Sequence, residues 1–251
     1  VVDVFTKAME LPGIQPVSLA LHIGSQLTTL SPYEEAFEAL ASLTQTLRAK
    51  GCTINRLDLG GGLGVVYDDE NVPSVSEYAA IINRTVGHLG CKLILEPGRF
   101  LVANTGLLVS QIVHVKLEDE KPILVVDAAM NDLMRPALYD AYHAILPIHA
   151  EPDSNISISC DVVGPICESS DTFARSRPLP PVSKGDLLAF LSAGAYGAVM
   201  ASTYNSRRLV PEVMVRGASF AIVRSRPNYD DMLALEHLPQ WHLSSSYNKG
   251  T

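Results

Sequence analysis

Short apolar runs alternate with helical patterns over the first hundred residues. Three runs, at residues 17–21, 56–59 and 92–95, are short and mainly apolar, and each ends in polar or glycine-rich residues. Strands that are covered on both faces have this composition. The segments between them place apolar residues three and four positions apart, which is typical of amphipathic helices. The order predicts βαβαβ units around a parallel sheet.

Two capping signals define the helices between the strands. Ser31-Pro32-Tyr33-Glu34 places a serine three residues before a glutamate, and Ser74–Glu77 repeats this capping-box spacing. The first helix is expected to start at Ser31 and to stop before Gly51. An amphipathic pattern from Val1 to Met9 predicts one more helix. The inward positions of the two capped helices are Phe37, Leu40, Leu43 and Leu47, then Tyr78, Ile81, Ile82 and Leu89.

The pattern changes after Gly106 to β-branched runs between turn signals. Five strands are expected, at residues 107–115, 123–127, 156–163, 187–191 and 213–223. They predict an antiparallel sheet, barrel or sandwich, and the proline-rich residues 177–181 are expected to form a loop. The resulting fold class is α/β plus β. We expect an α/β part at residues 1–105, a β domain at 106–243 and a disordered tail at 244–251.

Composition and charge narrow the class of partner. The formal net charge of −8 leaves no basic stripe for a nucleic-acid backbone. No apolar stretch approaches the length of a membrane span, and the start lacks a secretory signal. The four cysteines have neither zinc-site spacing nor disulfide-scaffold density, so no metal is expected. These features favour small-molecule chemistry in a cytoplasmic protein.

Three strand ends carry residues that suit a phosphorylated ligand. His22–Gln26, Gly60–Gly64 and Glu96–Arg99 each follow a predicted strand. Glycines let the main chain approach a phosphate, and a carboxylate can hold a ring nitrogen protonated. Each segment also has a simpler reading: a structural histidine, a plain glycine turn, and an internal ion pair between Glu96 and Arg99.

The β half contributes three more segments. Arg135–Tyr139 offers a guanidinium fork beside a phenol, Cys167–Asp171 places a thiol between carboxylates, and Gly194–Gly197 encloses a tyrosine. Taken singly, they are equally consistent with a surface arginine, a buried structural cysteine and an ordinary turn. Their order along the chain is more informative than any one of them.

In that order, the stretches HIGSQ, LDLGGGLG, EPGR, RPALY, CESSD, GAY and YN resemble those of the pyridoxal-phosphate decarboxylases with the alanine-racemase fold (fold type III), and among them the diaminopimelate decarboxylases. The resemblance spans residues 17 to 214. It implies that the first half supplies the last strands of a (β/α)8 barrel that binds pyridoxal 5′-phosphate. An antiparallel β-barrel or sandwich domain would follow.

The resemblance also implies a role for each residue of these motifs. His22 would stack on the pyridine ring, Glu96 would pair with its nitrogen, and Tyr196 would contact the cofactor and substrate. Cys167 would deliver a proton. The residues implied for the phosphate are Ser25, Gly60, Gly61, Gly62, Gly98 and Arg99. The residues implied for the substrate are Arg99, Arg135 and Tyr139 at the distal carboxylate and Glu168 at the distal amine.

Two further expectations follow from the resemblance. Family members form dimers with shared active sites, so Cys167 and Glu168 would serve the neighbouring subunit. The family's cofactor lysine, in a segment like Tyr-Ala-Xaa-Lys, has no counterpart here, and Ser170 stands where glycine is expected. We therefore expect the chain to be the C-terminal part of a longer enzyme and to be inactive alone.

Two alternatives stay open at this point. One is a related decarboxylase for arginine, ornithine or carboxynorspermidine, which would share the first three motifs. The other is a catalytically dead homologue that acts as a binding partner. The RPALY and CESSD segments favour decarboxylation of diaminopimelate to lysine.

Overall fold

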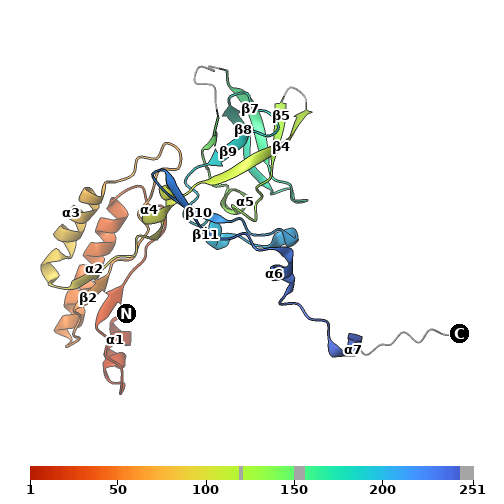
Figure 1. Cartoon of the computed structure of the whole chain (residues 1–251). Coiled ribbons are helices and arrows are strands. Elements are labelled where there is room, and N and C mark those ends of the chain that lie inside the picture. Colours follow the sequence, from red (N-terminus) through yellow and green to blue (C-terminus); the bar gives the residue numbers. More distant parts are fainter. Residues whose placement is uncertain (119–120, 150–155, 244–251) are drawn as a thin grey trace.

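The computed structural model describes residues 1–118, 121–149 and 156–243 (Figure 1). Its first half contains a three-stranded parallel sheet in the order β1-β2-β3, with α2 and α3 lying side by side against it. The parallel βαβαβ prediction is therefore confirmed. The strands are β1 (Ser18–Ala20), β2 (Arg56–Asp58) and β3 (Lys92–Ile94), and the helices are α1 (Val2–Met9), α2 (Ser31–Ala49), α3 (Val75–Thr85) and α4 (Gly98–Val102).

The two predicted capping boxes have different outcomes. Ser74 caps α3, accepting from the Glu77 N–H, and the Glu77 carboxylate accepts from the Ser74 N–H, so this box is confirmed. The box predicted at Ser31 is wrong, because Ser31 is already helical and Leu30 is the N-cap without a side-chain bond. Leu30 itself has helical backbone angles, and Pro32 needs no N–H partner in the first turn.

The core of this half lies between the helices and the sheet. Tyr33, Phe37 and Tyr78 form a cluster of aromatic rings, with Tyr33 and Tyr78 edge to face at 5.0 Å. Leu57 on the central strand is fully buried beneath them. These are the inward positions that the helical periodicity predicts.

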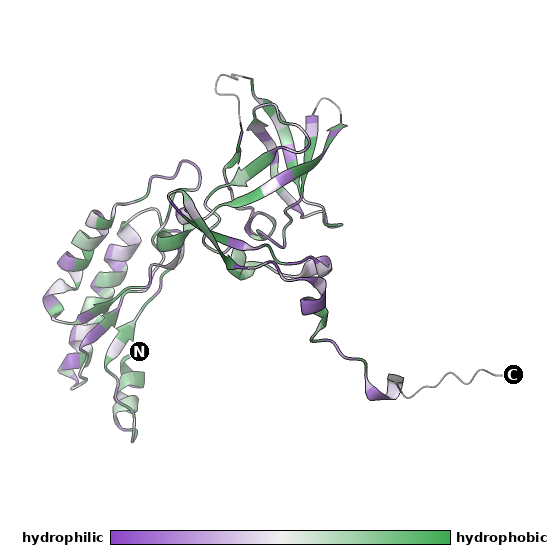
Figure 2. Cartoon of the chain, in the orientation of Figure 1, coloured by the Kyte–Doolittle hydropathy of each residue, from purple (hydrophilic) through white to green (hydrophobic). Residues whose placement is uncertain are grey.

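The second half forms a six-stranded sheet in the order β6-β9-β4-β5-β7-β8. Its edge strands, β6 and β8, lie close together, so the sheet is nearly closed. Figure 2 shows hydrophobic stretches along its strands, interrupted by hydrophilic ones. The strands are β4 (Leu108–Glu118), β5 (Lys121–Val126), β6 (Ile145–Pro147), β7 (Ile158–Val163), β8 (Thr172–Leu179) and β9 (Leu187–Phe190).

Three details of this sheet differ from the prediction. The sheet is mixed, because β7 runs parallel to β5 after the chain has passed through α5 (Arg135–Tyr139) and β6. The proline-rich segment expected as a loop is partly strand, since Pro178 pairs with Ser159 in β8. An edge strand tolerates proline because one of its sides needs no N–H donor. The short strand β6, also at an edge, is absent from the prediction.

The predicted strand at 213–223 is a two-stranded hairpin. β10 (Glu212–Arg216) and β11 (Ser219–Arg224) pair antiparallel, and Gly217 turns between them with φ +59°. Such a two-residue turn requires a residue at positive φ. Two short helices follow, α6 (Tyr229–Leu233) and α7 (Gln240–Leu243). The predicted disordered tail lies outside the described residues.

The two halves meet where the chain crosses itself near Gly106. Gly194 donates its N–H to the Ala103 carbonyl at 3.0 Å, and Ala193 donates to the Gly106 carbonyl at 2.8 Å. A Cβ atom on Gly194 would overlap the Val102 carbonyl, so only glycine permits this approach. Beside the crossing, Tyr67 packs in a small apolar cluster with Ala103 and Ala195.

Among the described residues, no helix has the length and apolar character needed to cross a membrane.

Candidate cofactor and substrate site

The loops after β1, β2 and β3 converge, as parallel strands require. Glu96 donates its N–H to the Gly60 carbonyl at 2.8 Å, and the Gly61 N–H lies 3.4 Å from His22 Nδ1. Gln26 ties the first two loops together, since its amide exchanges two hydrogen bonds with the Val65 main chain. The predicted strand-end residues are therefore neighbours.

The glycine cluster is confined by main chain on both sides. A Cβ atom on Gly61 would overlap the Glu96 carbonyl oxygen, and one on Gly62 would overlap the Gly24 carbonyl. Gly62 also has φ +94°, a conformation that side chains disfavour. The cluster is thus more than a plain turn, because each glycine permits a close approach between loops.

Only some of the expected phosphate-binding amides are available. The Gly60 N–H donates to Asp58 Oδ1 at 2.9 Å, and the Gly98 N–H donates to the Glu96 carbonyl at 2.8 Å. Within the described residues no acceptor is found for the Gly62 N–H. An anion at this point would therefore meet Gly62 first.

Arg99 extends from α4 into the same region. It donates to the Ser25 hydroxyl at 3.2 Å and to the Tyr67 hydroxyl at 2.6 Å, and its guanidinium lies 4.9 Å from the ring centroid of Tyr196. Its Nε is buried without a partner. No ion pair joins Arg99 to Glu96 among the described residues, so the internal ion pair considered from sequence is absent.

Arg135 on α5 contacts the same Tyr67 ring as Arg99. Its guanidinium is stacked 4.4 Å from the Tyr67 ring centroid, and its Nη1 donates to His143 Nε2 at 2.9 Å. His143 Nδ1 is 2.8 Å from the Leu191 carbonyl, which can only accept. His143 therefore carries its proton on Nδ1 and offers Nε2 as an acceptor.

Arg135 is a buried cation that has no acidic partner within the described part of the chain. It is 7% exposed, and the described residues supply it with one hydrogen bond and no carboxylate within ion-pair distance. Burial lowers the pKa of Arg135, and burial likewise lowers the pKa of His143 to about 4. An uncompensated buried charge is costly, so the site is electrostatically suited to an anion.

Two more predicted residues lie close by. Tyr196, which contacts Arg99, has φ +59°, a strained conformation for a residue with a side chain. Such strain is concentrated at functional sites. Tyr139 sits one helical turn after Arg135 and is 62% exposed, with its hydroxyl free to meet a ligand.

The predicted Cys167–Glu168 pair has contacts different from those of this group. Both residues are exposed, and Glu168 accepts a hydrogen bond from the Tyr204 hydroxyl at 3.3 Å, which raises the pKa of Tyr204. Within the described part of the chain, no hydrogen bond or ion pair joins either residue to Arg99 or Arg135. The structure thus brings the motifs together as two groups.

Asp171 holds the loop that carries these two residues. Its carboxylate accepts from the Met130 N–H at 2.6 Å and from the Ile166 N–H at 2.7 Å, and burial raises its pKa. A Cβ atom on Gly164 would overlap this carboxylate. The loop conformation is thereby fixed by a buried acid.

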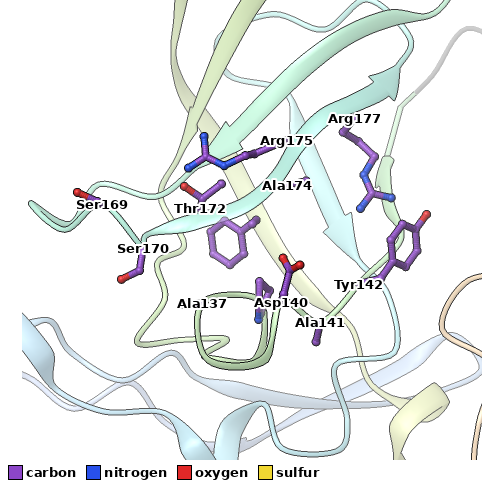
Figure 3. Close-up of a pocket in the computed structure, with 12 residues that line it drawn as sticks. Ala137, Asp140, Ala141, Tyr142, Ser169, Ser170, Thr172, Ala174, Arg175 and Arg177 are labelled. Carbon is purple, nitrogen blue, oxygen red and sulfur yellow. The ribbon is translucent and has the colours of Figure 1, made fainter.

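A hollow of about 380 Å³ lies beside this loop (Figure 3). It is lined by residues of α5, of β8 and of the Ser169–Ser170 turn, and Arg177 stacks 4.0 Å from the Tyr142 ring at one end. None of the predicted site residues lines it.

The family model described as "Pyridoxal-dependent decarboxylase, C-terminal sheet domain" matches residues 33–194. The chain belongs to the pyridoxal-dependent decarboxylases. The matched region includes the glycine cluster, both arginines and the Cys167 loop. Pyridoxal phosphate is the cofactor of this family, and its members are carboxy-lyases.

Curated decarboxylases of this family are similar to most of the chain. Diaminopimelate decarboxylase of Neisseria meningitidis is 45% identical over 234 residues, which cover 93% of this chain and 57% of that protein. The enzyme of Aquifex aeolicus is 42% identical over 227 residues, covering 90% and 54%. The chain therefore spans little more than half the length of these relatives.

Solved structures of pyridoxal-dependent decarboxylases have the same fold. Diaminopimelate decarboxylase of Helicobacter pylori, complexed with L-lysine, matches with a TM-score of 0.88 at 39% identity, over 93% of this chain and 58% of that one. A lysine/ornithine decarboxylase of Vibrio vulnificus, complexed with cadaverine, matches with a TM-score of 0.73 at 25% identity, over 81% and 55%.

Three residues of this candidate site are absent from the sequence-based assignment. Tyr67 and His143 support the arginines, and Asp171 supports the Cys167 loop. Asp171 ends the CESSD segment, so the sequence shows a carboxylate at this position but does not show that it is buried. Tyr67 and His143 do not lie in any motif that would distinguish them from other aromatic residues of the sequence.

Proposed function

We propose that the complete protein decarboxylates meso-2,6-diaminopimelate to L-lysine and carbon dioxide, as a homodimer with pyridoxal 5′-phosphate. The observation that carries the proposal is Arg135, a buried cation that has no acidic partner among the described residues and lies beside the strand-end loops. We also propose that the three parallel strands belong to an eight-stranded barrel. Its other strands and the cofactor lysine would lie in the remaining part of the complete protein.

The strand-end residues fit the cofactor. The Gly62 amide, the Ser25 hydroxyl and the unpartnered Arg99 Nε provide donors for its phosphate. Glu96 is exposed and its carboxylate has no partner among the described residues, so it is available to a pyridinium nitrogen. His22 is placed next to Gly61 to cover the ring. When bound, the cofactor supplies the electron sink for the bond that loses carbon dioxide.

The arginines favour a substrate with a second carboxylate. Arg99 and Arg135 stack on the same Tyr67 ring, 5.6 and 4.4 Å from its centroid, so both cations face one region. A distal carboxylate would satisfy the free donors of Arg135, and Tyr139 would add a hydroxyl. A distal amine or guanidinium, as in ornithine or arginine, would be repelled there.

Cys167 and Glu168 are proposed to complete the active site of the neighbouring subunit. Their exposure supports this arrangement, as does the lack of a hydrogen bond or ion pair to Arg99 or Arg135 among the described residues. In the partner's site, the Cys167 thiol would return a proton to the reacting carbon, and Glu168 would meet the distal amine. Asp171 would keep both in the required orientation.

The test is turnover by the complete protein with added pyridoxal phosphate. We expect carbon dioxide and L-lysine from meso-diaminopimelate, with little release from ornithine or arginine. A catalytically dead homologue would release none from any of these substrates, and preferred use of ornithine would overturn the assignment of Arg135.

Arg135→Ala sharpens this test. Loss of a charged hydrogen-bond donor to the distal carboxylate should raise KM for diaminopimelate about ten- to a hundredfold. Arg84→Ala is the control. Arg84 on α3 forms an exposed ion pair with Glu34 on α2, outside the proposed substrate site, so the substitution should leave KM unchanged. Unchanged KM in Arg135→Ala would refute its role.

A further inference from the structure

We propose that His143 is a positioning residue for substrate recognition, which acts by holding the Arg135 guanidinium in the orientation that receives the distal carboxylate. The inference rests on the proposed function and deepens it. It adds a residue that no motif indicated and that does not itself touch a ligand.

The connection runs through a continuous set of hydrogen bonds. The Leu191 carbonyl accepts from His143 Nδ1 at 2.8 Å, and His143 Nε2 accepts from Arg135 Nη1 at 2.9 Å. Leu191 directly follows β9, so the sheet fixes the position of its carbonyl. The hydrogen bond to this carbonyl in turn fixes the imidazole. The guanidinium is therefore anchored to the β domain through one side chain.

Packing restricts the remaining motion of the imidazole. His143 is 1% exposed and meets the Tyr67 ring edge to face at 5.5 Å. The same ring stacks on Arg135 at 4.4 Å. One hydrogen bond and one stacking face together define both the position and the plane of the guanidinium, as a planar bidentate contact with a carboxylate requires.

The arrangement also keeps His143 uncharged. The charged groups that face it are Arg135 on α5, Arg99 on α4 and Arg177 on β8, and Tyr67 faces it from the loop after β2. Burial opposes protonation most and the three cations add to it, which accounts for the low pKa of His143. A protonated imidazole would offer Arg135 no acceptor, so its neutral form is the one that positions the guanidinium.

Two substitutions separate positioning from simple packing. In the complete protein, His143→Gln places an amide oxygen near the Nε2 position and retains an acceptor for Arg135. His143→Asn is shorter, so its amide remains near the Leu191 carbonyl and does not reach Arg135. Both variants introduce a neutral amide of similar polarity. His114→Asn, at an exposed position on β4, is the matched control.

The readouts are KM and kcat for diaminopimelate, and calorimetric binding of L-lysine and of cadaverine. For His143→Asn we expect KM to rise about ten- to thirtyfold with kcat within about threefold, because one charge-assisted hydrogen bond is lost. L-lysine keeps the carboxylate that Arg135 would bind, so its affinity should fall by a similar factor. Cadaverine lacks that carboxylate and should bind unchanged. His143→Gln and His114→Asn should resemble the wild type.

Three outcomes would overturn the inference. One is a fall in kcat with KM and L-lysine affinity unchanged, as expected of a purely structural residue. Another is equal loss in the Gln and Asn variants. If the Asn variant does not fold, a rise of KM by threefold or more in the folded Gln variant refutes the inference, and a smaller rise supports it. Failure of the wild type to decarboxylate diaminopimelate would refute the proposed function instead, and L-lysine binding would still test His143.

Discussion

Asp171→Ala removes a carboxylate that accepts from two main-chain N–H groups, one buried and one partly buried. Asp171 is 3% exposed, and its two oxygens accept from Met130 N at 2.6 Å and from Ile166 N at 2.7 Å. A buried donor left without an acceptor costs about 1–3 kcal/mol, so the Ile166 N–H predicts a loss of about 1–3 kcal/mol from the free energy of unfolding, and the partly buried Met130 N–H adds to it. Asp171→Asn retains one acceptor oxygen and should cost about half as much.

Asp186→Ala is the matched control. Asp186 also accepts from a main-chain N–H at 2.7 Å, that of Ser183, but it is exposed, and water can replace it. Urea-induced unfolding of the complete protein, followed by far-ultraviolet circular dichroism, compares the three variants. Equal losses in Asp171→Ala and Asp186→Ala would show that burial of the carboxylate is not what fixes the loop.

The remaining predictions concern pH and the glycine cluster. Because the native pKa of His143 is about 4 and its ordinary value is 6.5, its contribution to stability is present above pH 6.5 and is lost as pH falls toward 4, by about 3 kcal/mol in all. Denaturant titrations of wild type and His143→Gln between pH 4 and 6.5 measure this contribution, and the same dependence of unfolding free energy on pH in both proteins would refute it. Burial raises the pKa values of Asp132 and Asp171, so these two carboxyls contribute in the opposite direction in both proteins. Gly61→Ala should destabilise by about 1–3 kcal/mol and weaken cofactor binding in an absorbance titration, since its Cβ would overlap the Glu96 carbonyl. Gly87→Ala, where a Cβ makes ordinary contacts, should leave cofactor affinity unchanged.

Local signals predicted the elements whose stabilising contacts are local. The box at Ser74–Glu77 forms because both partners lie within one turn. The same spacing at Ser31 does not form a box, because the preceding Leu30 already adopts helical angles. The direction of β7 beside β5 depends on pairing between distant segments, and no local pattern carries that information.

The candidate site likewise contains residues that local motifs identify and residues that only long-range contacts place. His22, Glu96 and Arg135 were identified from their residue types and from the order of their motifs. Tyr67 and His143 acquire their places through contacts with residues from 8 to 76 positions away, as in the bonds to Arg135 and the ring contact between the two. Burial gives these residues their importance, and burial is a property of the assembled fold.

The glycine crossing between the two halves has a consequence for ligand length. Arg99 follows the parallel strands and Arg135 belongs to the β domain, so the separation between the two cations depends on how closely Gly106 and Gly194 approach. A methyl group at either position would widen that gap while every ligand-facing side chain stayed the same. The crossing therefore sets the span of any ligand that bridges the two cations, and it does so without a side chain of its own.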